Sequence, residues 1–155
     1  MKIKLVLLFI PLLLSACQTN LLEIEREAMQ ATMEKHLNAV ATRNIEDLSA
    51  TLSTDDDMIL ILPQTEITYT TKEFIDYHIE WFEDTSWTFD SKIISLKAGT
   101  YFGMAVVEVM YREPNRNGKP YFNRMNVSYV LEKKAGRWCV IKDHASSIEK
   151  GEDKQ

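Results

Sequence analysis

The chain has 155 residues and a net charge of −5, with 45% hydrophobic and 26% charged residues. This length suits one domain with a single core. The acidic balance argues against nucleic acid as a partner, because the phosphate backbone attracts basic surfaces.

The residue types that bind metals and phosphates do not form known motifs. His36, His78 and His144 are the only histidines, and they lie in separate segments without the short spacing of a zinc site. Residues 55–57 are aspartates, but they lack the alternating ligands and the glycine of a calcium loop. No glycine-rich phosphate loop occurs. We therefore predict no metal and no other cofactor.

The first 17 residues, MKIKLVLLFIPLLLSAC, have the order of a secretory signal. Lys2 and Lys4 precede an apolar run over residues 5–14, which is shorter than the roughly 20 residues of a membrane-spanning helix. The junction Leu-Ser-Ala-Cys resembles a bacterial lipobox, which implies cleavage after Ala16 and lipidation of Cys17. The alternative is ordinary cleavage after Ala16, which would release an unlipidated protein.

The lipobox interpretation divides the chain into a signal peptide (1–16), a lipidated cysteine with a short tether (17–24), one domain (25–148) and a frayed tail (149–155). The net charge changes from −5 to −7, because Lys2 and Lys4 leave with the signal. A lipidated Cys17 leaves Cys139 without a disulfide partner, since the chain has two cysteines. Gln18 resembles a sorting signal for a Gram-negative outer membrane. We expect a lipid-anchored protein of the cell envelope, which in a Gram-negative bacterium would sit on the outer membrane and face the periplasm.

Helical patterns dominate the first half of the domain. Apolar residues recur at spacings of seven, four, four and three along one helical face, at Leu22, Met29, Met33, Leu37 and Val40. Residues 44–52 are predicted as a second helix with Asn44 as its N-cap. A capping box of Thr70 and Glu73 predicts a third helix over residues 72–83. Its buried side should carry Phe74, His78, Trp81 and Phe82.

Strand patterns follow. Residues 58–62 form an apolar run that predicts a short strand, with residues 66–69 as its hairpin partner. Four longer strands are predicted over residues 87–97, 101–112, 121–132 and 137–147, separated by turn signals. Such strands form an antiparallel meander, and the preceding helices should cover one of its faces.

The closing stretch Gly-Arg-Trp-Cys-Val-Ile-Lys-Asp-His-Ala-Ser, after three helices and a long sheet, resembles the SnoaL-like branch of the nuclear transport factor 2-like superfamily. It is also similar to the association domain of calcium/calmodulin-dependent kinase. The resemblance implies a cone-shaped α+β barrel, with N-terminal helices packed in a curved antiparallel sheet of four to six strands. It also implies a pocket inside the cone and a homodimer through the outer face of the sheet.

Strand alternation separates the polar residues of the closing stretch into two sets. We predict that the concave face carries Cys139, Ile141, Asp143 and Ala145, and that the convex face carries Trp138, Val140, Lys142, His144 and Ser146. Cys139 is interpreted as a buried apolar filler. Asp143 is a candidate acid or base, because a carboxylate on an apolar face is costly unless it is paired or protonated. The alternatives are an ion pair or a position open to water.

Family resemblance places further residues at known positions. Tyr129 and Ala145 occupy the positions of two pocket arginines of the kinase association domain, so a clamp for an anionic ligand is not expected. His36 stands where ketosteroid isomerases carry a catalytic tyrosine, and it is either a hydrogen-bond donor or a satisfied core residue. Leu62 stands where their general base is expected, so isomerase activity is not transferred. Glu108 is left open as inward or outward.

Three functions remain for the domain. The first is binding of a small, largely apolar molecule by Tyr129, Asp143, Trp81, His78, Met125 and Trp87. The second is an acid–base enzyme, a hydratase, isomerase or hydrolase, with Asp143 as base and His36 or His78 as donor. The third is a dimeric interaction protein without a ligand, which pairs through Trp138, Val140 and His144.

Overall fold

The computed structural model describes the backbone of residues 10–64 and 66–152, and the side chains of residues 21–64 and 66–151. The predicted signal peptide falls partly outside these described residues. The side chain of Cys17 falls wholly outside them.

Three helices form in the places that the local sequence signals predict. They are α1 (Ile10–Thr42), α2 (Ile45–Ala50) and α3 (Thr71–Glu83). The Asn44 side chain accepts the Asp47 N–H at 3.0 Å and starts α2. The Thr70 hydroxyl accepts the Glu73 N–H at 3.0 Å and starts α3. These bonds satisfy N–H groups that have no partner within the helix.

Helix α1 is longer than expected, and it includes residues 17–24, which the sequence suggested as a tether. Among the described residues, no helix has both the length and the apolar character that crossing a bilayer requires.

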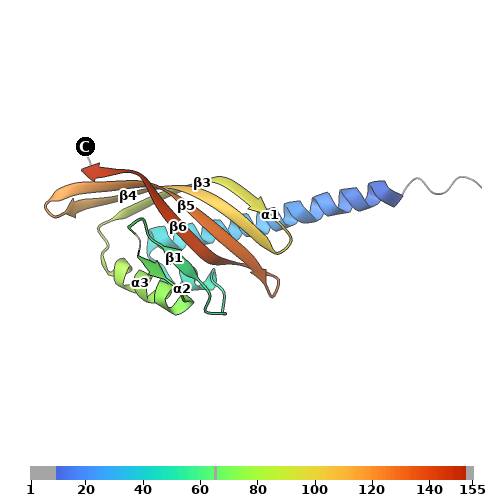
Figure 1. Cartoon of the computed structure of the whole chain (residues 1–155), viewed down its shortest axis with the longest axis horizontal. Helices are drawn as coiled ribbons and strands as arrows, with labels where there is room; N and C mark the ends of the chain where they lie inside the picture. Colours follow the sequence, from blue (N-terminus) through green and yellow to red (C-terminus); the bar gives the residue numbers. More distant parts are fainter. Residues whose placement is uncertain (1–9, 65, 153–155) are drawn as a thin grey trace, which may run out of the picture.

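The six strands form one curved, open sheet over the helices (Figure 1). The strands are β1 (Ile59–Ile61), β2 (Ile67–Thr68), β3 (Thr88–Ala98), β4 (Phe102–Arg116), β5 (Lys119–Lys134) and β6 (Arg137–Glu152). Their order is β2-β1-β6-β5-β4-β3, and all neighbours are antiparallel except β1 and β6. The predicted α+β class and helix-covered sheet are confirmed, although the sheet does not close into a barrel. Residues 149–152, predicted as part of a frayed tail, pair with β5.

A β-bulge in β6 corrects the predicted facing of the closing stretch. Val130 pairs with Lys142, but Leu131 pairs with Val140, so Ile141 is an extra residue in β6. Trp138 and Val140 therefore turn inward and are buried, which makes their predicted place on the convex face wrong. Beyond the bulge, Asp143 is buried on the concave side and His144 is exposed on the convex side.

The core lies between α1 and the sheet. The apolar face of α1 packs into it through five buried residues, which are Met29, Met33, Leu37, Ala39 and Val40. Gly103 on β4 permits the close approach of this helix, because a Cβ atom there would overlap the Met29 sulfur. Burial of these side chains is the main stabilising contribution to the fold.

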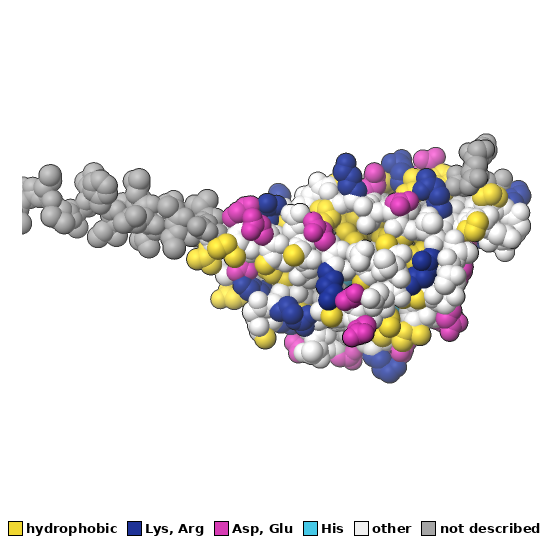
Figure 2. Space-filling model, turned by 180° about the vertical axis from the view of Figure 1, so that it is seen from behind, with side chains coloured by type: hydrophobic (Ala, Val, Ile, Leu, Met, Phe, Trp, Pro, Cys, Tyr) yellow, Lys and Arg dark blue, Asp and Glu magenta, His cyan; other side chains and the backbone are white. Residues whose placement is uncertain are grey.

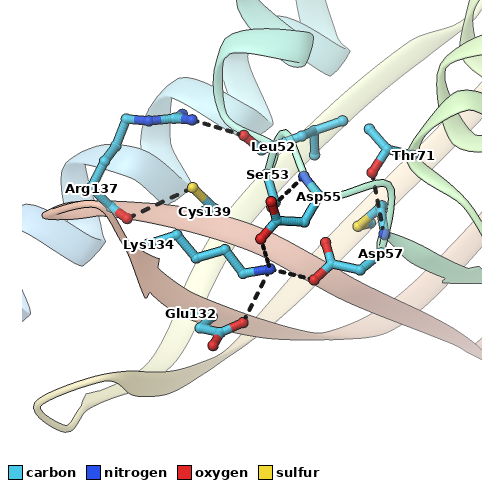
Figure 3. A network of polar contacts seen from close by, with 10 residues as sticks. Leu52, Ser53, Asp55, Asp57, Thr71, Glu132, Lys134, Arg137 and Cys139 are labelled. Atoms are coloured by element: carbon cyan, nitrogen blue, oxygen red, sulfur yellow. Dashed lines mark hydrogen bonds and ion pairs between the residues drawn. The ribbon is translucent and has the colours of Figure 1, made fainter.

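The loop after α2 is held on the outer face of the β5–β6 hairpin by a charged network (Figure 3). The Lys134 ammonium lies 2.9 Å from Asp55, bonds Asp57, and lies 3.4 Å from Glu132. Cys139 is fully buried beside this network, and burial raises the pKa of its thiol. Its interpretation as a buried filler therefore agrees with its burial, but its predicted place on the concave face is wrong, because the bulge places it opposite Glu132 on the outer face. Two of the three aspartates at residues 55–57, Asp55 and Asp57, are thus partners of a lysine.

Candidate functional site

A cavity of about 350 Å³ lies between helices α1 and α3 and the concave face of β5 and β6. Its buried floor includes His36, Tyr129 and Asp143, and aromatic side chains of α3 and β4 form its walls, among them Tyr77, Trp81 and Tyr111. A cavity of this size, with aromatic and aliphatic walls and several polar groups, can hold a small molecule.

The structure brings together most of the residues that the sequence suggested for a ligand. Tyr129, Asp143, Trp81, His78 and Met125 all line the cavity. Trp87 does not: it lies behind Trp81, with ring centroids 4.4 Å apart in a stacked arrangement, and only 1% of it is exposed. Its indole N–H donates to the Trp81 carbonyl at 3.2 Å. Trp87 therefore supports the wall from behind.

Asp143 is the most unusual residue of the floor. Only 6% of it is exposed, and its Oδ1 atom has no hydrogen-bond partner among the described residues. Burial raises the pKa of this carboxyl to about 8, because the apolar surroundings penalise the charged form. Within the described part of the chain Asp143 has no ion-pair partner, and its low exposure excludes a position open to water. At neutral pH the group is mainly a carboxylic acid, which can donate a hydrogen bond.

Tyr129 stands directly opposite Asp143 in the β5–β6 ladder. Burial and the neighbouring Asp143 carboxyl raise the pKa of the Tyr129 phenol well above its ordinary value. Tyr129 therefore keeps its hydroxyl proton. The floor thus carries two neutral O–H groups, which come from paired residues of neighbouring strands.

His36 is held in one tautomer by Thr51. The Thr51 hydroxyl donates to the Leu48 carbonyl at 2.6 Å, so its oxygen must accept a proton from His36 Nδ1 at 2.8 Å. Nε2 then carries no proton and can only accept. Burial, and next the nearby His78, lower the His36 pKa to about 3, so the ring stays neutral.

His78 has the same tautomer for a different reason. Its Nδ1 lies 2.8 Å from the Phe74 carbonyl oxygen, which can only accept. Burial lowers the His78 pKa to about 4. Both histidines therefore have Nε2 as an acceptor, and neither can be the hydrogen-bond donor suggested from the sequence.

The mouth of the cavity carries a group of residues that the sequence analysis missed. The Tyr111 hydroxyl donates to Glu113 at 2.6 Å, and Arg116 Nε donates to the same carboxylate at 2.8 Å. The Arg116 guanidinium stacks 3.6 Å over the Tyr121 ring, and its pairing holds the Glu113 pKa below the ordinary value. Pro114 ended the predicted strand at residue 112, but β4 continues through it to Arg116.

The sheet also fixes which face carries the other residues discussed from the sequence. Glu108 faces outward, where it lies 3.7 Å from Arg124 across the convex face. Tyr129 and Ala145 both face the cavity, and neither is an arginine. Leu62 also lines the cavity, with an apolar side chain. Within residues 21–64 and 66–151, no group of three histidine, cysteine or acidic side chains could hold a metal ion.

Solved structures with this fold are similar in shape and distant in sequence. A ketosteroid isomerase-like protein from Erwinia carotovora atroseptica has a TM-score of 0.69 and 19% identity, over 81% of this chain and 97% of that one. A candidate dehydratase of the nuclear transport factor 2-like family from Streptomyces avermitilis has a TM-score of 0.70 and 12% identity, over 82% and 98%. A candidate calcium/calmodulin-dependent protein kinase type II association domain from Thiobacillus denitrificans has a TM-score of 0.66 and 16% identity, over 77% and 94%.

At such low sequence identities, the similarity to these structures shows a shared fold alone. None of the curated proteins compared with the chain matches it in sequence. The family model of the SnoaL-like domain matches residues 29–149, which include every residue that lines the cavity. The chain therefore belongs to the SnoaL-like domain family.

Proposed function

We propose that the cavity binds a small, largely apolar and uncharged molecule that has a hydrogen-bonding group at one end. The observation that carries this proposal is Asp143, a buried carboxyl with an unpartnered oxygen on the floor of a cavity of about 350 Å³. A buried polar atom without a partner costs free energy, and a ligand group that bonds it recovers this cost.

The polar groups of the floor define the chemistry of that ligand end. The Asp143 acid and the Tyr129 hydroxyl are donors, whereas Nε2 of His36 and of His78 are acceptors. A ligand group that both accepts and donates, such as a hydroxyl beside a carbonyl, matches this set. The aromatic walls suit a flat or apolar remainder.

A thermal-shift screen of the purified protein against hydroxyl- and carbonyl-bearing apolar molecules tests the proposal. A ligand at about 100 times its Kd should stabilise the protein by about 2.7 kcal/mol, a shift of several degrees. Asp143→Ala should abolish the shift, while Asp143→Asn, which keeps a donor, should retain part of it. Glu108→Gln is the matched control, because it changes an outward carboxylate on the same sheet. A hit that Asp143→Ala leaves unchanged would contradict this site.

The pH dependence of binding separates a neutral ligand from an amine. A neutral acceptor binds the protonated acid, so its affinity should fall as the pH rises through about 8. An amine would pair with the carboxylate, and its affinity would rise over the same range. The second result would contradict an uncharged ligand.

The same floor favours an acid–base enzyme as the second candidate, a hydratase, isomerase or hydrolase. A carboxyl with a pKa of about 8 can deliver and recover a proton near neutral pH. Asp143 would move the proton and Tyr129 would stabilise a developing oxyanion, while the histidines would accept hydrogen bonds. Any turnover should fall about 10²- to 10⁴-fold in Asp143→Asn. Turnover that Asp143→Asn leaves intact would rule out this assignment.

The N-terminal sequence supports a further part of the proposal, namely lipid anchoring through Cys17 in the cell envelope. Mass spectrometry of the N-terminal peptide should find Cys17 as the first residue, with its amine and sulfur both acylated. Cys17→Ser should remove the protein from the membrane fraction. An unmodified N-terminus at Cys17 would contradict the anchor.

The homodimer also remains a proposal. The outer face of the sheet would provide the interface with His144, but without Trp138 and Val140, which are buried within the chain. Sedimentation that shows a monomer at micromolar concentration would contradict it.

A further inference from the structure

Apolar side chains are exposed at the end of the domain where α1 joins the sheet. On α1, Leu21, Leu22 and Ile24 are between 43% and 56% exposed. Beside the β3–β4 turn, Tyr101 is 66% and Phe102 is 57% exposed. Figure 2 shows hydrophobic side chains gathered at this left-hand end of the described surface. We call these five residues the apolar end.

The two parts of the apolar end are tied together by contacts. The Lys133 N–H donates to the Tyr101 carbonyl at 2.7 Å, and the Lys133 ammonium bonds Glu25 of α1. Met29 of α1 lies against Gly103, next to Phe102. The helix and the turn therefore form one surface (Figure 1).

The arrangement of these side chains suits a bilayer better than a protein groove. Successive helical residues turn by about 100°, so Leu21, Leu22 and Ile24 spread over roughly 160° of the helix circumference. A groove covers one stripe of a helix, whereas a bilayer surrounds a helix that enters it end-on. Tyrosine and other aromatic residues are also common at membrane–water interfaces.

Two carboxylates at this end are paired with cations. Glu23 pairs with Arg26 at 2.8 Å, and Glu25 pairs with Lys133. These two carboxylates are therefore neutralised locally, although the chain as a whole is acidic. Repulsion from anionic headgroups is correspondingly reduced.

The distance to the proposed anchor is short. Cys17 lies on α1 four residues before Leu21, which is about 6 Å along the helix at 1.5 Å per residue. A lipid on Cys17 would therefore bring the apolar end to the headgroup region. This step depends on the proposed lipidation of Cys17.

We propose that the apolar end rests in the bilayer interface and fixes the orientation of the domain, with the cavity mouth directed into the aqueous compartment. Phe102 begins β4, and the mouth residues Glu113 and Arg116 lie toward its other end. The eleven residue steps from Phe102 to Glu113, at about 3.3 Å each, span roughly 36 Å. The cavity would then take its ligand from water and not from the bilayer.

Fluorescence of the full lipoprotein in vesicles of phosphatidylethanolamine and phosphatidylglycerol tests this orientation. An environment-sensitive dye is attached at Phe102→Cys, or at Lys150→Cys as the matched control. Lys150 is exposed and pairs with Asn123, near the cavity mouth. Both variants also carry Cys139→Ala, so that the dye has one target, and thermal melting confirms that each is folded.

The dye at residue 102 should shift to shorter wavelengths on vesicle binding and be quenched several-fold more by brominated lipid than the dye at residue 150. Equal, weak quenching at both positions, with the protein still floating with the vesicles, would overturn the apolar end as a membrane contact and leave the anchor intact. If the protein does not float with the vesicles, the anchor itself is wrong, and the orientation is wrong with it.

Discussion

Asp143 on β6 and Tyr129 on β5 are direct neighbours across the antiparallel ladder, and both line the cavity floor. Each keeps its proton at neutral pH, because burial raises both pKa values. The site is therefore a neutral pair of hydrogen-bond donors. The pH dependence of the free energy of unfolding should reveal these protonation states without any ligand.

The first prediction concerns Asp143 and the stability between about pH 4 and pH 8. Between about pH 4 and 8 the folded state holds a proton on Asp143 that the unfolded state has lost. The contribution of Asp143 to the free energy of unfolding should therefore fall as the pH rises through this window, by up to about 1.4 kcal/mol per pH unit, and level off above 8. Urea unfolding at each pH should show that Asp143→Asn removes this slope. The control Glu108→Gln should retain it, and parallel curves for all three proteins would contradict the prediction.

The second prediction concerns the two buried histidines and has the opposite sign. His36 and His78 stay neutral when folded, with pKa values of about 3 and 4, but take up protons near pH 6.5 when unfolded. Stability from these groups is present above pH 6.5 and is lost as the pH falls toward 4. His78→Leu should reduce the acid slope by about half in the same urea series. An unchanged acid slope would show that His78 is not buried as a neutral ring.

The third prediction concerns the bond that sets the His36 tautomer. Thr51→Val leaves the buried Nδ1–H without an acceptor, which should cost about 1–3 kcal/mol of stability. Nitrogen-15 NMR of the histidine ring should also show that the Nδ1–H tautomer is no longer dominant. Thr42→Val, which changes an exposed threonine on α1, is the control. A destabilised variant with an unchanged tautomer would contradict the role of Thr51.

The fourth prediction concerns the close contact between α1 and β4. Gly103→Ala should destabilise the fold by about 1–3 kcal/mol, because the new methyl group overlaps Met29 and approaches the Lys97 carbonyl at 2.9 Å. Gly151→Ala, whose nearest neighbour would lie 4.0 Å away, should have little effect. Combining Gly103→Ala with Met29→Ala should give less than the sum of the two losses. Strict additivity would mean that the two residues do not meet.

The sequence predicted the features that depend on neighbouring residues. The caps at Asn44 and Thr70 were recognised because each bond spans three residues. The facing of Trp138 was predicted wrongly, because one extra residue at Ile141 reverses the alternation of side chains. Such a bulge depends on pairing with another strand, which the local sequence does not show.

Features that depend on distant contacts could not be predicted in the same way. The tautomer of His36 on α1 is set by Thr51, which lies fifteen residues later in the chain, at the C-terminal end of α2. The mouth residues Glu113 and Arg116 flank Pro114, which indicated a turn in the sequence. Their pairing at the cavity mouth arises because β4 continues past this proline to Arg116. The burial of Asp143 was anticipated from alternation, whereas its neutral state required the structure.

The most direct test of the site is a carbon-13 NMR titration of the Asp143 carboxyl, assigned by its absence in Asp143→Asn. We predict a midpoint near pH 8, well above that of an ordinary aspartate. A midpoint near 4 would show that Asp143 is a charged, solvated carboxylate, and it would contradict a neutral donor pair on the cavity floor.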